Sequence, residues 1–150
     1  MDFDKREMNV TFGAGVIYSE LIEFCVKNKV ALRNVPSLPH INVVGGVVTG
    51  THGSGLKMQA IANDIVGMRI INPNGELQIL EKEDVDFPYY LHSFGALGAI
   101  TEMTIEVIQE FAVKKCIYEG LSWEFMTTVE EYIKVMESGT YLSFFTPWES

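Results

Sequence analysis

The stretch that decides the fold reads Thr49-Gly50-Thr51-His52-Gly53-Ser54-Gly55, and it is preceded by Gly45-Gly46. Glycines carry no side chain, so the backbone N–H groups of such a stretch can approach a ligand closely. The hydroxyls of Thr49, Thr51 and Ser54 can in addition donate to phosphate oxygens. Together these residues predict a cradle for a pyrophosphate.

Two better-known uses of a glycine-rich stretch do not fit this one. The stretch is not a Walker loop, because Lys57 is not followed by Ser or Thr and the flanking spacing is wrong. It is not the G-x-S-x-G elbow of a serine hydrolase either, because His52 stands two positions before Ser54 and the first glycine of that motif is therefore misplaced. The sequence therefore supports neither ATP hydrolysis nor a serine nucleophile.

The histidines offer no metal site. His52 lies in a glycine-rich turn, where a histidine often braces the loop through hydrogen bonds, and this interpretation stands beside one in which it lines the ligand. His40 and His92 have no partner at metal-ligand spacing, and no Cys/His cluster occurs. We expect no bound metal.

Upstream of this stretch, the pattern predicts a strand, a tight turn and a helix. Val10-Thr11-Phe12 predicts the strand, Gly13-Ala14-Gly15 the turn, and Ser19 the start of a helix. The paired glycines resemble the start of a dinucleotide fingerprint, but Tyr18 occupies its third glycine position and no acidic residue follows at the required distance. We interpret these glycines as a turn only.

Downstream, the pattern predicts an antiparallel sheet. Prolines and glycines exclude a long regular element from residues 32–54. Residues 65–71 and 77–80 predict a β-hairpin, because Asn72-Pro73-Asn74-Gly75 between them suits a tight turn. Residues 101–107 alternate polar and apolar side chains with the period of a half-buried strand. We expect an α+β fold, with an antiparallel sheet flanked by helices.

The last forty residues predict the start of a second domain. Residues 111–118 and 141–145 predict strands, and Thr128 with Glu131 predicts a capping box for a helix that runs to about Glu137. A strand begun at Tyr141 has little chain left in which to pair. We therefore divide the chain into a domain over residues 1–110 and the beginning of another over residues 111–150.

Composition limits the partners and the location. The 150 residues include 20 acidic and 11 basic ones, a net charge of −9 without a basic cluster, which argues against nucleic-acid binding. Apolar runs such as residues 41–48 are too short to span a membrane, and the N-terminus lacks a secretion-signal pattern. Cys25 and Cys116 fit two reduced thiols. These features favour a cytoplasmic location.

Two motifs, in order, resemble those of a known flavoprotein family. Residues 36–43 together with residues 49–55 resemble the second FAD-contacting loop of the vanillyl-alcohol-oxidase-type (PCMH-type) flavoproteins, in the branch of the aldonolactone and alditol oxidases. Residues 95–101 are similar to the segment at the adenosine end of the flavin in that family. Residues 142–148 look more like the alditol and xylitol oxidases than the lactone oxidases, although alone they also fit an ordinary aromatic core strand.

The resemblance implies FAD as cofactor and a particular set of contacts. The residues that would line the flavin and its pyrophosphate are Ser37, Asn42, Gly45, Thr49, Gly50, Thr51, His52, Gly53 and Ser54, with Gly98 and Ile100 at the adenosine end. The implied reaction is oxidation of a polyol such as xylitol or sorbitol by oxygen, which yields an aldose and hydrogen peroxide. An aldonolactone oxidase of the same family, or a non-catalytic binding module, stays open as an alternative.

The resemblance also implies that the chain is an internal piece of such an enzyme. The first pyrophosphate loop of the family, with the histidine that bonds the flavin, would lie upstream of residue 10, and its substrate-binding acid and bases would lie beyond residue 150. We expect the isolated chain to hold FAD weakly or not at all and to oxidise no polyol, because each lost charge-assisted hydrogen bond to a diphosphate costs about 1.5–3 kcal/mol.

Overall fold

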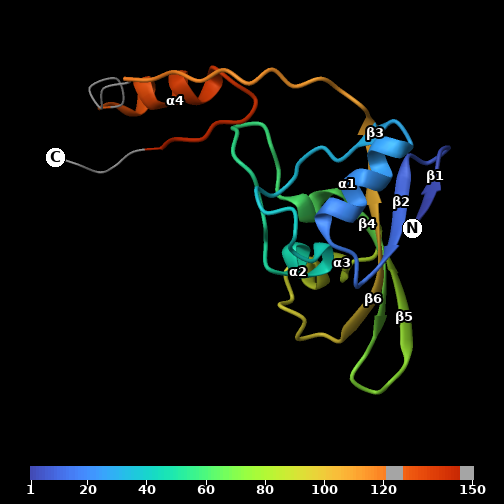
Figure 1. The fold of residues 1–150 in the computed structure, drawn as a ribbon. Helices are drawn as coiled ribbons and strands as arrows, with labels where there is room; N and C mark the ends of the chain where they lie inside the picture. The colour runs from blue at the N-terminus through green and yellow to red at the C-terminus, as the bar shows by residue number, and fades with distance from the viewer. Residues whose placement is uncertain (121–126, 146–150) are drawn as a thin grey trace.

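A five-stranded antiparallel sheet forms the body of the protein (Figure 1). The computed structural model describes residues 1–120 and 127–145. The strand order is β1-β2-β6-β4-β5, and every neighbouring pair is antiparallel. The strands are β1 (Asp2–Asp4), β2 (Asn9–Gly13), β4 (Ile65–Ile71), β5 (Leu77–Glu81) and β6 (Ala99–Glu106); a small second sheet pairs β3 (Val30–Ala31) with β7 (Ile108–Gln109). The expected α+β fold with an antiparallel sheet is confirmed.

Short helices accompany the sheet. They are α1 (Tyr18–Lys27), α2 (Val43–Val48), a 3₁₀ turn η1 (Ile61–Asp64), α3 (Phe87–Leu91) and α4 (Val129–Glu137). The long irregular stretch expected over residues 32–54 is interrupted only by the six residues of α2. In the part of the chain that the structure describes, no helix has the length and apolarity needed to cross a membrane.

The β4–β5 hairpin follows the predicted turn. Gly75 adopts a φ of 81°, a conformation that side chains with a Cβ rarely adopt. The side chain of Asn72 accepts hydrogen bonds from the backbone N–H groups of Asn74 (2.9 Å) and Glu76 (3.0 Å), which fixes the turn. The hairpin predicted from Asn72-Pro73-Asn74-Gly75 is confirmed.

The core lies on one face of the sheet. On β6, Met103 and Ile105 are buried and pair with Phe12 and Val10 of β2, as the period-2 pattern predicts. Helix α1 contributes its buried residues, among them Leu21, to the same apolar cluster. The opposite face carries polar groups such as the hydroxyls of Thr11 and Thr104, which are 2.9 Å apart.

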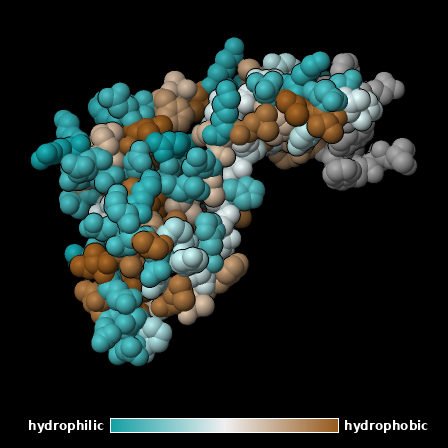
Figure 2. All heavy atoms as spheres, turned by 180° about the vertical axis from the view of Figure 1, so that it is seen from behind, coloured by the Kyte–Doolittle hydropathy of each residue, from teal (hydrophilic) through white to brown (hydrophobic). Residues whose placement is uncertain are grey.

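In the C-terminal segment, residues 111–120 and 127–137 extend away from this body and are mostly exposed (Figures 1 and 2). Helix α4 begins with the predicted capping box, in which the Thr128 side chain accepts from the N–H of Glu131 (3.2 Å). None of its residues is buried, and apolar side chains such as Val129 (70% exposed) face solvent.

Two strands predicted in this C-terminal segment are wrong. Residues 111–118 form no strand, because they run exposed through solvent with no neighbouring strand to pair with among the described residues. Residues 141–145 form no strand either. There Tyr141 and Leu142 instead make hydrogen bonds to Arg33 and Ser54 in the body of the protein.

Candidate functional site

Asn42 anchors the glycine-rich stretch at the start of α2. Its side-chain oxygen accepts a hydrogen bond from the N–H of Gly45 (2.8 Å), which caps the helix. Its side-chain nitrogen donates to the carbonyls of Ala14 (2.6 Å) and Val16 (3.2 Å) in the turn after β2. One side chain therefore joins the turn after β2 to the glycine-rich stretch.

The segments on either side of this anchor run side by side. The N–H of Val43 donates to the carbonyl of Val16 (3.0 Å), and the N–H of Tyr18 donates to the carbonyl of Ile41 (3.1 Å). Residues 13–15 form a turn into α1, as the interpretation of their glycines predicted. The backbone of the candidate site is thus fixed to the sheet.

At four glycines in or just before the stretch, Gly46, Gly50, Gly53 and Gly55, a side chain would not fit or would be strained. A Cβ on Gly46 would lie 3.0 Å from the Tyr18 hydroxyl oxygen, and a Cβ on Gly53 would overlap the side-chain oxygen of Asn34. Gly50 has a φ of +74°, and a Cβ added to it would lie 3.4 Å from the ring of His92. Close packing of the backbone is therefore built into the loop.

A run of backbone N–H groups in the loop is free to bind a ligand. Within residues 1–120 and 127–145, no hydrogen-bond partner is found for the N–H groups of residues 52–55. The hydroxyl of Thr51 also has no partner among these residues. Consecutive free amides of this kind form anion-binding concavities.

Other polar side chains of the stretch are engaged by the protein itself. The hydroxyl of Thr49 donates to the carbonyl of Gly45 (2.8 Å). The ring nitrogen Nδ1 of His52 lies 3.0 Å from the carbonyl oxygen of Gly53, a local contact of the bracing kind. The hydroxyl oxygen of Ser54 accepts from the N–H of Leu142 (2.8 Å). Of the three hydroxyls predicted to donate to phosphate, that of Thr51 is therefore the one without a hydrogen-bond partner among the described residues.

The second motif meets the first through the loop before β6. The N–H of Phe94 donates to the carbonyl of Val48 at the end of α2 (3.2 Å), close to the contact between His92 and Gly50. Gly98 has a φ of +142° and packs against β4, and Ile100 pairs with Ile70 in the sheet. Residues 42–54 and the approach to β6 are therefore neighbours.

Ser37 has no hydrogen bond to the other predicted residues within residues 1–120 and 127–145. It is exposed in the irregular segment between β3 and α2. Its role as a flavin contact, like that of the other predicted contacts, stays a prediction.

Sequence reasoning missed two buried residues that support the loop. Asn34 is 5% exposed; its side-chain nitrogen donates to the carbonyl of Gln59 (3.1 Å) and its oxygen accepts from the N–H of Val35 (2.9 Å). Tyr18 is fully buried against Gly46. Asn34 follows Arg33 and Tyr18 precedes Ser19, so the local sequence gives no signal that either side chain is buried.

A charge cluster lies next to the loop's supporting residues. Arg33 pairs with Asp64 and, at 3.0 Å, with Glu106. Burial raises the pKa of Asp64 even though the Arg33 guanidinium opposes this shift. The hydrogen bond to Glu106 raises the pKa of Arg33. This cluster joins the segment after β3 to β6. None of residues 45–55 is itself acidic.

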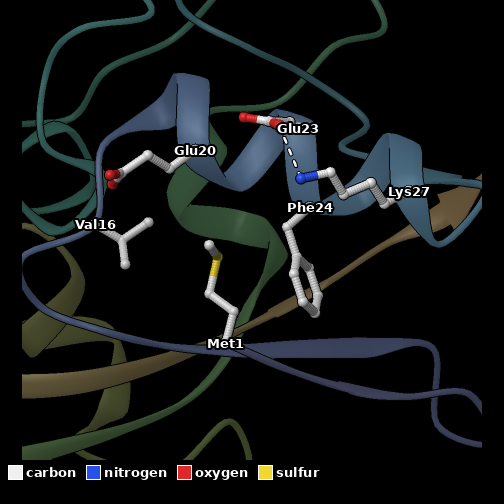
Figure 3. A pocket seen from close by; sticks show the side chains of 6 residues that line it. All are labelled: Met1, Val16, Glu20, Glu23, Phe24 and Lys27. Atoms are coloured by element: carbon white, nitrogen blue, oxygen red, sulfur yellow. Dashed lines mark ion pairs between the residues drawn. The ribbon is translucent and has the colours of Figure 1, made fainter.

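A separate hollow of about 360 Å³ lies beside α1 (Figure 3). It is lined by Met1, Val16, Glu20, Glu23, Phe24 and Lys27. Glu23 and Lys27 form an ion pair of 2.8 Å across one turn of the helix. The hydrogen bond that Lys27 donates in this pair lowers the pKa of Glu23. None of the predicted site residues lines this hollow, so it is not the candidate site.

Comparison with known proteins bears on the same loop. The family model described as "FAD binding domain" matches residues 1–81. The chain is similar to an alditol oxidase of Streptomyces sp. (31% identity over 147 residues, 98% of this chain and 34% of the relative) and to a D-arabinono-1,4-lactone oxidase of Kluyveromyces lactis (32% over 141 residues, 87% and 27%).

A solved structure gives the same picture. An alkyldihydroxyacetonephosphate synthase aligns with a TM-score of 0.64 and 27% identity over 73% of this chain and 21% of its own. The chain thus spans about a third or less of the length of these relatives. The residues that the family model matches include the whole glycine-rich stretch.

Proposed function

We propose, from the premise that this chain belongs to the FAD binding domain family, that its glycine-rich loop holds the pyrophosphate of FAD in an oxidoreductase that oxidises a polyol. FAD is the cofactor that the description of the family names. The polyol substrate, and oxygen as electron acceptor, belong to the proposal.

The observation that carries the proposal is that the N–H groups of residues 52–55 have no partner in the part of the chain that the structure describes. A diphosphate needs several donors, and this loop offers the N–H groups of residues 52–55 and the hydroxyl of Thr51, none of which has a partner within residues 1–120 and 127–145. No acidic side chain lies within residues 45–55 to repel the anion. The residues present therefore fit the pyrophosphate of FAD.

When bound, FAD would supply the redox chemistry, the acceptance of a hydride from the alcohol carbon and the transfer of its electrons to oxygen, so that alcohol and oxygen would give aldehyde and hydrogen peroxide. The share of this chain is to bind and orient the cofactor. Asn42 fixes the position of the loop, and residues 50–55 approach the diphosphate. Gly98 and Ile100 offer backbone to the adenosine end.

The substrate class rests on the relatives and on one short motif. The alditol oxidase matches almost the entire chain, but the lactone oxidase matches with the same level of identity. The motif Leu142 to Trp148 favours a sugar alcohol, although residues 146–148 lie outside the described residues. An aldonolactone is therefore the second candidate substrate.

The domain division is also part of the proposal. We place the flavin-binding unit in residues 1–110 and the start of a second unit in residues 111–150. Helix α4 supports this division, because an amphipathic helix of nine residues with no buried side chain needs further structure to cover it.

Flavin retention tests the proposed site. The protein expressed from the intact reading frame, called the intact protein below, should be yellow, and FAD added to its apoprotein should raise the melting temperature. Gly50→Val should abolish flavin retention. Gly75→Val is the matched control, because Gly75 has a similar φ of +81° but no atom within 4 Å of an added Cβ.

Both variants should lose about 1–2 kcal/mol of stability from backbone strain, and only Gly50→Val should lose the flavin. If Gly50→Val retained as much flavin as Gly75→Val, the assignment of the pyrophosphate site would be refuted. Peroxide release with xylitol, sorbitol and an aldonolactone then separates the two substrate classes. A colourless protein whose melting temperature does not change when FAD is added would favour the non-catalytic binding module.

A further inference from the structure

The hydroxyl group of Tyr18 is buried without a hydrogen-bond partner. Tyr18 opens α1, is 0% exposed, and its hydroxyl has no partner among the residues that the structure describes. Burial raises the pKa of Tyr18 to about 12, so the hydroxyl is a protonated donor at neutral pH. A buried donor of this kind costs stability unless something else satisfies it.

The unpartnered hydroxyl lies directly behind the glycine-rich loop. A Cβ on Gly46 would lie 3.0 Å from the Tyr18 hydroxyl oxygen and 3.3 Å from Oγ1 of Thr51. Both oxygens therefore face the same side of Gly46, and glycine at this position keeps the space between them open. The Thr51 hydroxyl is itself unpartnered within the described residues.

We propose that Tyr18 is a positioning residue of the FAD site: its hydroxyl donates to Oγ1 of Thr51, and Thr51 then donates its own hydroxyl proton to the cofactor's pyrophosphate. A threonine hydroxyl has one proton to donate and two lone pairs to accept with, so it can link the two groups. Because Tyr18 occupies one lone pair, the Thr51 proton is directed outward, and such a chain strengthens both hydrogen bonds. This inference rests on the proposed function.

The Tyr18 hydroxyl contributes no hydrogen bond within residues 1–120 and 127–145. A phenylalanine at this position would therefore lose no hydrogen bond among these residues. Because both hydroxyl oxygens lie within 3.3 Å of the Cβ position of Gly46, a rotation of the Thr51 side chain or a shift of its loop on diphosphate binding would bring its hydroxyl to Tyr18. The benefit of the hydroxyl therefore belongs to the bound state.

The test is Tyr18→Phe in the intact protein, which removes one oxygen atom. We expect the melting temperature of the apoprotein to stay the same or rise, and the affinity for FAD to fall about tenfold, the equivalent of about 1.4 kcal/mol. FAD binding is followed by titration of the apoprotein and the change in flavin fluorescence. Tyr89→Phe, at an exposed tyrosine, is the matched control and should change neither quantity.

A double-mutant cycle separates a positioning role from a direct one. Thr51→Val should weaken FAD binding by itself, and adding Tyr18→Phe to Thr51→Val should weaken it no further. Thr51→Ser, which keeps the hydroxyl, should restore the sensitivity to Tyr18→Phe. Unchanged FAD affinity in Tyr18→Phe would overturn the inference, and so would additive losses in the double variant.

Failure of the inference is distinct from failure of the proposed function. If Gly50→Val loses the flavin while Tyr18→Phe binds FAD as the wild type does, only the role of Tyr18 is wrong. If Gly50→Val retains the flavin, the loop is not the pyrophosphate site and both proposals fail. A large drop in the melting temperature of the Tyr18→Phe apoprotein would show a structural role instead and would overturn the inference.

Discussion

The N–H of Leu142 donates a 2.8 Å hydrogen bond to Oγ of Ser54, across 88 positions of sequence. On either side of it, Thr140 approaches Gly55 so closely that a Cβ there would overlap its carbonyl oxygen, and the Tyr141 hydroxyl donates to the carbonyl of Arg33 (2.6 Å). The segment after α4 thus lies against the end of the glycine-rich stretch. A region assigned to the second domain is in contact with the candidate site.

Ser54→Ala should loosen this contact. The N–H of Leu142 loses its only acceptor among the described residues, and a net hydrogen bond is worth about 1 kcal/mol, so its hydrogen exchange should accelerate about fivefold. Ser93→Ala is the control, because Oγ of Ser93 accepts only from the nearby N–H of Gly95 (3.3 Å). Equal exchange at Leu142 in wild type and Ser54→Ala would contradict the contact.

Asn42→Asp should destabilise the loop although the new side chain can still cap α2. A carboxylate accepts from the N–H of Gly45, but it cannot donate to the carbonyls of Ala14 and Val16 and places negative charge against them. We expect a loss of about 1–3 kcal/mol in urea denaturation, since the half-buried carbonyl of Ala14 loses its donor among the described residues, whereas that of Val16 keeps the N–H of Val43.

The control for this substitution is Asn28→Asp at the exposed end of α1. The side chain of Asn28 also donates to a backbone carbonyl, that of Phe24 (2.9 Å), but in contact with solvent. Water replaces the lost donor there, and the unfavourable charge at a helix C-terminus costs only about 0.3–1 kcal/mol. Equal losses for the two variants would show that Asn42 does not anchor the loop.

The elements that the sequence predicted correctly are those with a local cause. The hairpin depends on the four residues at its turn, and α4 depends on the capping box of Thr128 and Glu131. The period-2 pattern identified β6, because one face of that strand is buried by residues directly opposite on β2. Each signal lies within a few residues of the structure it specifies.

The features that the sequence did not predict depend on distant partners. Residues 111–118 have a strand-like composition, but a strand also needs a neighbour, and none lies beside them in the part of the chain that is described. Asn34 and Tyr18 support the loop through Gly53 and Gly46, contacts that only packing reveals. The glycine-rich stretch was recognisable as a site, whereas its supporting residues were not.

Gly98→Ala should destabilise the fold more than Gly95→Ala does. Both glycines have a positive φ, +142° and +75°, and lie in the same loop before β6. A Cβ on Gly98 would overlap the carbonyl oxygen of Ile71 and crowd Ile70, whereas nothing lies within 4 Å of one on Gly95. We expect Gly95→Ala to lose about 1 kcal/mol and Gly98→Ala about 1–3 kcal/mol more in thermal denaturation. Equal melting temperatures would refute the close approach of β4 to Gly98.

The buried carboxyl of Asp64 should make stability depend on pH in an unusual direction. Burial raises its pKa, although Arg33 opposes this shift, and Glu106 and Lys82 also act on it. A folded-state pKa above that of the unfolded chain means that the folded protein takes up the proton first as the pH falls. This contribution to stability is complete below the unfolded pKa and is lost as the pH rises through the folded one.

Asp64→Asn tests this sign, since the amide cannot titrate. The free energy of unfolding is measured with urea between pH 7 and pH 4 for the wild type and the variant. The difference, wild type minus Asp64→Asn, should increase as the pH falls, because only the wild type gains stability by protonating Asp64. If the difference shrinks on acidification instead, the ion pair with Arg33 outweighs burial and holds the Asp64 carboxylate in its charged form.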